Sequence, residues 1–287
     1  MAAPIQPRLR LQDRRRRLAW VKVTAGASVV ALGLVLVFYV SHLPQMTIAT
    51  VDVSGTNLVS ADEVHALVSQ QLAGSYAFLV PHANALVLPA GSIKTAIENS
   101  FPPVKSVAIS MKGFTTLQVA ITERQPAALW CAGTPSGEIA NDSNAATSTP
   151  STSPAPPAGG CYLMDSGGFI FAPLATTTEY ARFYGALSAN PIGSTYLGGG
   201  FASLQEELGN IASSIHLTPV ETLVDNNGTD VSVAFTDGGV VRFVRTADPQ
   251  STVDNIASVF ASQSFAQNKN FEYADFRFGD KVYVKFK

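Results

Sequence analysis

The strongest constraint on this chain is a run of 21 residues, Val23 to Leu43, that contains no formally charged side chain. An α-helix rises about 1.5 Å per residue, so a helix of this length crosses a hydrocarbon core of roughly 30 Å. The run is apolar on all sides, which favours a bilayer span over an interfacial helix or the core helix of a soluble protein. We therefore expect a transmembrane helix over 23–43 that ends near Pro44.

Charge is distributed unevenly around this run. The first 22 residues carry seven basic side chains against Asp13 alone, a net charge of +6, whereas the other 265 residues carry a net charge of −8. Residues 41–57 include no Lys or Arg, so the positive-inside rule predicts a basic cytoplasmic tail, 1–22, and an exported body. A short basic arm on an acidic body does not suit phosphate binding, so we expect no nucleic-acid partner.

A cleaved signal peptide is the alternative interpretation of the same segment. Arg16 and Arg17 precede the apolar run as they would in a twin-arginine leader. The run is longer than a usual signal sequence, and the nearest small-x-small site is the poor match at 47–49. The body is exported under either interpretation.

Two cysteines, Cys131 and Cys161, are the only ones in the chain. Each borders a strand-like run, and disulfides persist in exported domains, so we predict a disulfide between them; two buried free thiols are the alternative. The residues between them, 132–160, are dominated by Ser, Thr, Pro, Ala and Gly and are expected to form a disordered insert. No histidine stands at ligand spacing from either cysteine, so we expect no metal site.

The segment 46–123 has the pattern of a compact α+β domain. Two helices are expected, one from a capping box at Ser60–Glu63 and a second that ends at Pro102. Alternating apolar residues predict three strands, a first one over 48–55 and a hairpin turned at Gly113. The predicted order is strand, helix, helix, strand, strand.

The segment 124–287 is expected to be a mainly antiparallel β domain with flanking helices. A helix is predicted over 201–215, where Leu204, Leu208, Ile211 and Ile215 recur at helical spacing, and another after Asp248. Three strands are separated by Asn-Gly and Asp-Gly dipeptides, which type I′ hairpin turns favour, and the chain closes in a hairpin turned at Gly279. The predicted strands are 218–224, 230–235, 240–245, 271–278 and 281–286.

These patterns together resemble the FtsQ/DivIB family of bacterial cell-division proteins. The resemblance is carried by the segments 51–55 (VDVSG), 101–107 (FPPVKSV), 121–126 (ITERQP) and 271–285 (FEYADFRFGDKVYVK). It covers about 18–287 apart from the insert, and it implies a POTRA domain at 46–123 followed by the family's β domain at 124–287. It also implies residence in the cell (inner) membrane at the division septum.

Catalytic and cofactor motifs are missing from the sequence. It contains no G-x-S-x-G, no G-x-G-x-x-G and no P-loop, and Gly198–Gly200 lacks a lysine that would contact phosphate. The segment 225–230 resembles a calcium loop, but its glycine is at the fourth position instead of the sixth. We therefore expect neither enzymatic activity nor a cofactor.

The last strand is a candidate docking edge, because no later strand follows to pair with it. Val282, Val284 and Phe286 are expected to face the core and the residues between them to face outward. The resemblance implies that FtsB/DivIC-like and FtsL-like bitopic proteins dock here by strand addition. The residues it implicates are Tyr283, Val284, Lys285 and Phe286, and more weakly Arg277; alternatively, the lysines protect an edge that stays unpaired.

A second candidate edge is 104–112, because the last strand of a POTRA fold is central and the strand before it lies outside. Val107, Ile109 and Met111 mark this segment, and an unoccupied edge is the alternative.

The resemblance thus implies a non-enzymatic divisome scaffold that helps regulate septal peptidoglycan synthesis. One alternative is a POTRA-type assembly factor for exported chains, although no succession of barrel strands follows the POTRA segment. Another is an exported binding protein, which would need a polar pocket.

Overall fold

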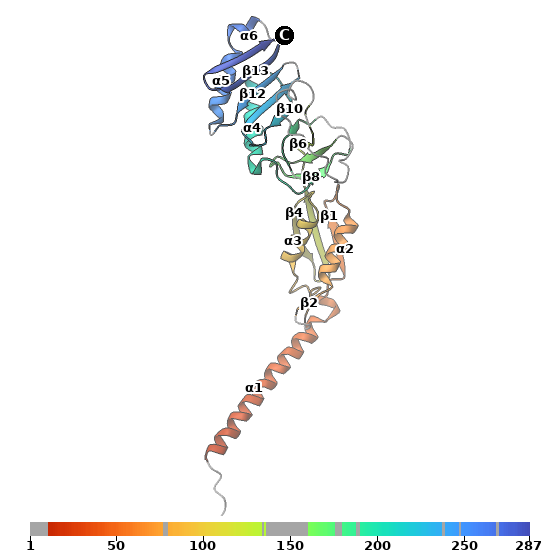
Figure 1. Ribbon diagram of the computed structural model, residues 1–287. Coiled ribbons are helices and arrows are strands. Elements are labelled where there is room, and N and C mark those ends of the chain that lie inside the picture. The colour runs from red at the N-terminus through yellow and green to blue at the C-terminus, as the bar shows by residue number, and fades with distance from the viewer. Residues whose placement is uncertain are drawn as a thin grey trace, which may run out of the picture. The chain divides into compact units, whose positions relative to one another are not determined.

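The computed structural model describes residues 11–76, 80–133, 135, 160–175, 180–187, 190–236, 239–246, 248–267 and 270–287 (Figure 1). The chain forms two compact units, Met1–Glu123 and Arg124–Lys287. Most of the predicted insert, 134 and 136–159, lies outside the described residues.

The first helix, α1 (Leu11–Ser41), is longer than the span predicted at 23–43, because it continues through the arginines that precede the apolar run. Arginine is a good helix former, so a charged segment can extend an apolar helix. Within the described residues one stretch, Arg16–Ser41, is long and apolar enough to cross a membrane. The helix ends before Leu43, whose backbone is extended (φ −64°, ψ 130°) because a following proline disfavours helical geometry.

The rest of the first unit has the predicted order of strand, helix, helix, strand, strand. In its sheet the strand order is β1-β5-β4, with β5 parallel to β1 and antiparallel to β4. Two helices, α2 and α3, pack their buried side chains against this sheet. The elements are β1 (Thr50–Ser54), α2 (Ala61–Leu72), α3 (Ala90–Ser100), β4 (Val104–Lys112) and β5 (Thr116–Glu123), with a short hairpin of β2 (Ser75–Tyr76) and β3 (Val80–Pro81) between the helices.

The start of α2 differs from the predicted capping box. Ser60 is the N-cap residue, but its side chain makes no capping hydrogen bond. The loop before the helix is held instead by the buried carboxylate of Glu123, which accepts hydrogen bonds from the backbone N–H groups of Asn57 (2.8 Å), Leu58 (2.9 Å) and Val59 (3.0 Å). Burial alone would raise the pKa of Glu123, but these three donors outweigh it and lower the pKa.

The second unit is built on a nine-stranded sheet of order β14-β13-β12-β11-β10-β9-β6-β7-β8. Buried side chains of α4 and α5 pack with those of the central strands in one large core. The strands of this unit are β6 (Ala128–Cys131), β7 (Cys161–Met164), β8 (Ile170–Pro173), β9 (Arg182–Tyr184), β10 (Pro219–Val224), β11 (Asp230–Phe235), β12 (Val240–Val244), β13 (Phe271–Phe278) and β14 (Lys281–Phe286). Its helices are η3 (Tyr196–Gly199), α4 (Phe201–Ile215), α5 (Pro249–Phe260) and α6 (Gln263–Gln267). The first unit also contains a short 3-10 helix, η1 (Pro44–Met46).

This sheet is mixed: five of its eight strand pairs are antiparallel, in agreement with the predicted mainly antiparallel domain, and the parallel pairs were not predicted. Parallel pairing occurs between β12 and β13, between β10 and β9, and between β6 and β9. Parallel neighbours need a long crossover, and α5 and α6 supply it between β12 and β13. The three-residue β9, which joins the two halves of the sheet, has too short an apolar pattern to be predicted.

The turn between β10 and β11 also differs from its prediction. A type I′ turn needs positive φ at both central residues, but of Asn227 and Gly228 only the glycine has positive φ (74°). The turn is held by Asp225, whose Oδ1 accepts from the N–H groups of Thr229 (2.7 Å) and Asp230 (3.0 Å). The other predicted I′ dipeptide, 237–238, lies outside the described residues.

The two cysteines form a disulfide, Cys131–Cys161, between paired positions of β6 and β7. It joins two neighbouring strands at the point where the chain leaves the sheet toward the insert.

Candidate functional site

The strand β14 lies at one edge of the nine-stranded sheet, antiparallel to β13. Exposure alternates along it: Lys281, Tyr283 and Lys285 are exposed, whereas Val284 and Phe286 are partly buried against the core. The apolar face therefore fixes the strand on the domain, and its outer edge can offer N–H and C=O groups to an added strand.

Aromatic side chains border this edge on its exposed face. Tyr283 is 50% exposed and Phe278 is 56% exposed, and their rings meet edge to face with centroids 5.1 Å apart. Lys285 forms an ion pair with Glu272 of β13 (Nζ–Oε2 2.5 Å). The predicted docking residues of β14 thus comprise two core-facing anchors, an exposed tyrosine, and a lysine that is paired within the domain.

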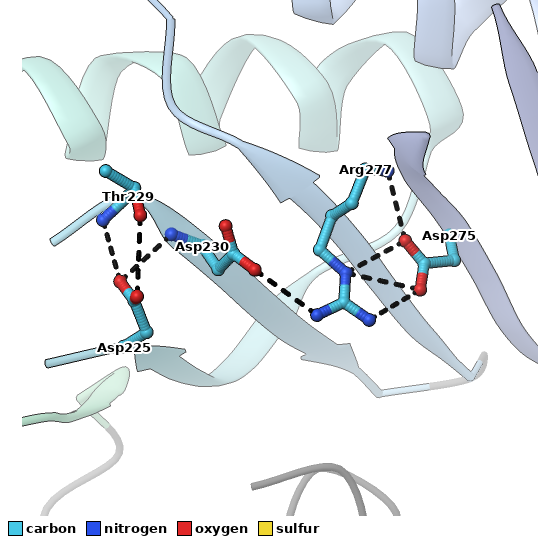
Figure 2. A network of polar contacts seen from close by, with 5 residues as sticks. All are labelled: Asp225, Thr229, Asp230, Asp275 and Arg277. Atoms are coloured by element: carbon cyan, nitrogen blue, oxygen red, sulfur yellow. Dashed lines mark hydrogen bonds and ion pairs between the residues drawn. The ribbon is translucent and has the colours of Figure 1, made fainter. Parts of the chain in front are cut away.

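Arg277, which the resemblance implicates in docking more weakly than the residues of β14, is bonded within its own domain. Its guanidinium donates to both carboxylate oxygens of Asp275, with an Nη2–Oδ2 distance of 2.7 Å, and to Oδ2 of Asp230 at 3.3 Å (Figure 2). Figure 2 shows the arginine between the two aspartates, so that it links β13 to the start of β11. Arg277 therefore stabilises the domain through contacts within the chain.

The same network sets the charge state of Asp275, which is 5% exposed. Burial would raise its pKa, but hydrogen bonds from the side chain and backbone N–H of Arg277 outweigh burial, so the pKa is lowered. The β13–β14 register shifts between Asp275 and Phe278, which places a bulge beside the bonded pair. An ionised Asp275 holds this bulge, and with it the path of β13 next to β14.

The second candidate, β4, is an edge strand of the three-stranded sheet. Val107 is buried, and Ile109 and Met111 pack against the core of their own unit, so the three predicted side chains face inward. The exposed residues on the other face include Ser106 and Ala108. A partner that binds at this edge would therefore contact backbone groups and small side chains, and not the apolar side chains of Val107, Ile109 and Met111.

The other edge of the large sheet, β8, is partly covered by its own domain. Ile170 donates its N–H to Ser194 O (2.9 Å), and its carbonyl accepts from Gly193 N (2.8 Å). Its last residue is Pro173, which cannot donate to a ladder. Of the two edges of this sheet, β14 is thus the more accessible to an added strand.

A cavity of about 350 Å³ lies beside the β10–β11 turn, lined in part by Tyr196, Val224, Asn226 and Arg245. Arg245 donates to the carbonyls of Gly228 (3.2 Å) and Gly200 (3.2 Å). Tyr196 donates its hydroxyl proton to Tyr184 O (2.6 Å), and burial raises its pKa, so it stays protonated. These groups hold the surrounding loops together.

Within the described part of the chain no group of three or more His, Cys, Asp or Glu could hold a metal ion.

Comparison with known proteins adds no family to this geometry. No protein-family model matches the chain, and no curated protein matches it significantly.

Proposed function

We propose that this chain is a non-enzymatic scaffold of the bacterial divisome that binds bitopic division proteins similar to FtsB/DivIC and FtsL by accepting a strand at β14. In this proposal α1 anchors the chain in the cell (inner) membrane at the septum, with the N-terminus in the cytoplasm and both units outside. The scaffold helps regulate septal peptidoglycan synthesis by holding its partners, and forms no bond itself.

One observation carries the proposal: within the described residues β14 is the last strand at one edge of the nine-stranded sheet, with Val284 and Phe286 packed against the core and Tyr283 exposed. Strand addition draws its affinity from main-chain hydrogen bonds and its specificity from side chains next to the edge. Tyr283, half-exposed beside Phe278, supplies an aromatic surface that an added segment could cover.

The supporting context is the length and composition of α1 together with the charge before it. A single apolar helix that follows seven basic residues suits a bitopic protein. The β-α-α-β-β unit between helix and sheet domain has the element order of a POTRA domain. Through the β4 edge this unit offers a further site for other divisome proteins or extended peptides.

The test is retrieval of partners from division-competent bacterial membranes by three full-length baits: the unchanged chain, Tyr283→Ala, and Val220→Ala. Val220 is an exposed apolar residue of the interior strand β10, so its variant controls for loss of a surface side chain. We expect Tyr283→Ala to retrieve less of a small bitopic division protein than the other two baits. Equal retrieval by all three would remove β14 as the site, and retrieval of no division protein by any bait would contradict the proposed function.

A further inference from the structure

Exposed apolar side chains in the first unit gather at one end. Outside α1, the large apolar residues that are exposed in the described part of this unit are Leu58, Tyr76, Leu86, Val87 and Phe114. Leu86 is 66% exposed and Phe114 is 57% exposed, so the rest of the unit leaves most of each side chain uncovered. Four of these five residues lie near the end of α1, and the following contacts fix that position.

Leu86 and Val87 are tied to the last turn of α1 by Asn84, which is buried. The Asn84 side-chain Nδ2 donates to the carbonyl of Ser41, the last residue of α1, at 2.9 Å, and its Oδ1 accepts from the N–H of Leu86 at 2.9 Å. Ala85 also donates its N–H to Met46 O (2.9 Å). One amide side chain therefore caps the helix end and holds the exposed apolar pair beside it.

Phe114 and Tyr76 reach the same end by other routes. Phe114 lies in the β4–β5 turn, where the next residue, Thr115, accepts through its carbonyl from the N–H groups of Ala49 (2.8 Å) and Thr50 (3.1 Å). Thr50 is the first residue of β1 and Ala49 precedes it, shortly after α1 ends. Tyr76 lies on the β2–β3 hairpin, whose β3 strand contacts α1.

The opposite end of the unit has a different character. Leu58 is bonded through its N–H to Glu123, the last residue of β5, whereas Phe114 lies beyond the first residue of β5. A strand rises about 3.3 Å per residue, so the eight residues of β5 separate these ends by about 25 Å. Acidic Asp62 and Glu63 occupy the first turn of α2 at the Leu58 end, whereas exposed Lys112 stands near Phe114.

We infer that Tyr76, Leu86, Val87 and Phe114 form an apolar rim that inserts into the lipid headgroup layer of the membrane that α1 spans. This inference rests on the proposed membrane anchor. A lipid surface is the partner that these observations favour, because the four residues lie at the end of the unit where the apolar helix joins it. Aromatic and aliphatic side chains are stable in the interfacial layer, and Lys112 can contact anionic headgroups there. The rim would restrict the tilt of the unit on its anchor.

The experiment uses the full-length chain in vesicles of phosphatidylcholine and phosphatidylglycerol that contain a headgroup-level nitroxide lipid. A fluorophore is attached to Leu86→Cys, Phe114→Cys or, as the control from the opposite end, Leu58→Cys; the natural cysteines are joined to each other and do not react. We expect strong nitroxide quenching at positions 86 and 114 and no quenching at position 58.

The outcomes separate this inference from the proposed function. If the chain floats with the vesicles while positions 86 and 114 are as unquenched as position 58, the rim does not touch lipid; the inference is overturned and the anchor stands. If the chain does not float with vesicles, the anchor and the rim fail together. If the labels become shielded only after a purified division protein is added, the rim is a protein-binding surface and the lipid assignment is wrong.

Discussion

Glu123 shows how one carboxylate can join segments that are far apart in sequence. It ends β5 and accepts the backbone N–H groups of Asn57, Leu58 and Val59, more than sixty positions earlier. Sequence reasoning placed the stabilising carboxylate at Glu63 within the local S-x-x-E pattern, because that motif is visible over four residues. A partner supplied by a distant strand leaves no local pattern, so the Glu123 contact could not be predicted.

Replacement of this carboxylate gives a residue-level prediction. We expect Glu123→Gln to lower the free energy of unfolding by about 1–3 kcal/mol, because buried donors lose a charged acceptor. The folded-state pKa of Glu123 is lowered, so its contribution is complete above the ordinary glutamate pKa and is lost as pH falls through the folded-state value. Denaturant titrations of the full chain in detergent should show a smaller acid-induced loss of stability in this variant.

The matched control is Glu98→Gln, which alters an i,i+4 surface pair between the partly exposed Glu98 and the exposed Lys94 (3.9 Å) in the same unit. Such pairs contribute about 0.3–0.5 kcal/mol, so the control should unfold nearly as the unchanged chain does. If the two variants behave alike at every pH, Glu123 does not hold the loop.

Arg277 gives a second prediction at this scale. Arg277→Ala leaves the buried Asp275 without its main donors, and we expect a loss of about 2–4 kcal/mol of unfolding free energy. The control Lys94→Ala removes an exposed partner and should cost less than about 1 kcal/mol. Denaturant titration of both variants measures these losses. If Arg277→Ala leaves the free energy of unfolding unchanged, Arg277 has no structural role and is available to bind a partner.

Elements were predictable where a pattern is long and local. The helical spacing of Leu204, Leu208 and Ile211 gives α4, Phe201–Ile215, with its observed bounds, and alternation gives the β13–β14 hairpin around Gly279. Strand direction was not predictable, because the same alternation fits a parallel or an antiparallel neighbour. The parallel β12–β13 pairing is set by the helical crossover between the two strands, and β9 is too short to show a period.

The same reasoning applies to the candidate site. Alternation predicted that Val282, Val284 and Phe286 face the core and that Tyr283 is exposed. The structure confirms this for Val284, Phe286 and Tyr283, whereas Val282 is partly buried outside that core cluster. Alternation did not reveal that Arg277 is bound by Asp230 of β11, because that contact joins residues 47 positions apart. It also did not show that the Val107 side chain would be buried in the core of its own unit, because the position of a strand at a sheet edge does not determine where its side chains point.

The disulfide gives a prediction at the scale of elements. Cys131 and Cys161 are 30 positions apart and join β6 to β7 across the base of the insert. For a loop of this length the chain-entropy model gives about 3–4 kcal/mol of stabilisation. We expect the double variant Cys131→Ser, Cys161→Ser to lose that amount in denaturant titrations, and the denatured, unreduced chain to react with no thiol reagent. Two reactive thiols would contradict the pairing.

At the scale of the whole molecule, three features combine into one account. The N-terminal helix is long and apolar enough to span a membrane and is the proposed anchor, the unit with the proposed apolar rim follows it in sequence, and the mixed sheet of the second unit ends in the edge strand β14. None of these features needs a reacting group, since an anchor and a strand acceptor act through burial and main-chain hydrogen bonds. In this account, main-chain hydrogen bonds at β14 supply the affinity for the partner. Membrane anchoring of the chain restricts the directions from which a partner can reach that strand.

Addition of a partner strand at β14 must slow backbone hydrogen exchange of the amides that it engages. The measurement compares the full chain in lipid nanodiscs with and without a purified FtsB/DivIC-like protein. We predict slower exchange along β14, Lys281–Phe286, on addition of the partner, with β8, Ile170–Pro173, unchanged as the other edge of the same sheet. Binding that leaves β14 exchange unchanged would contradict the account.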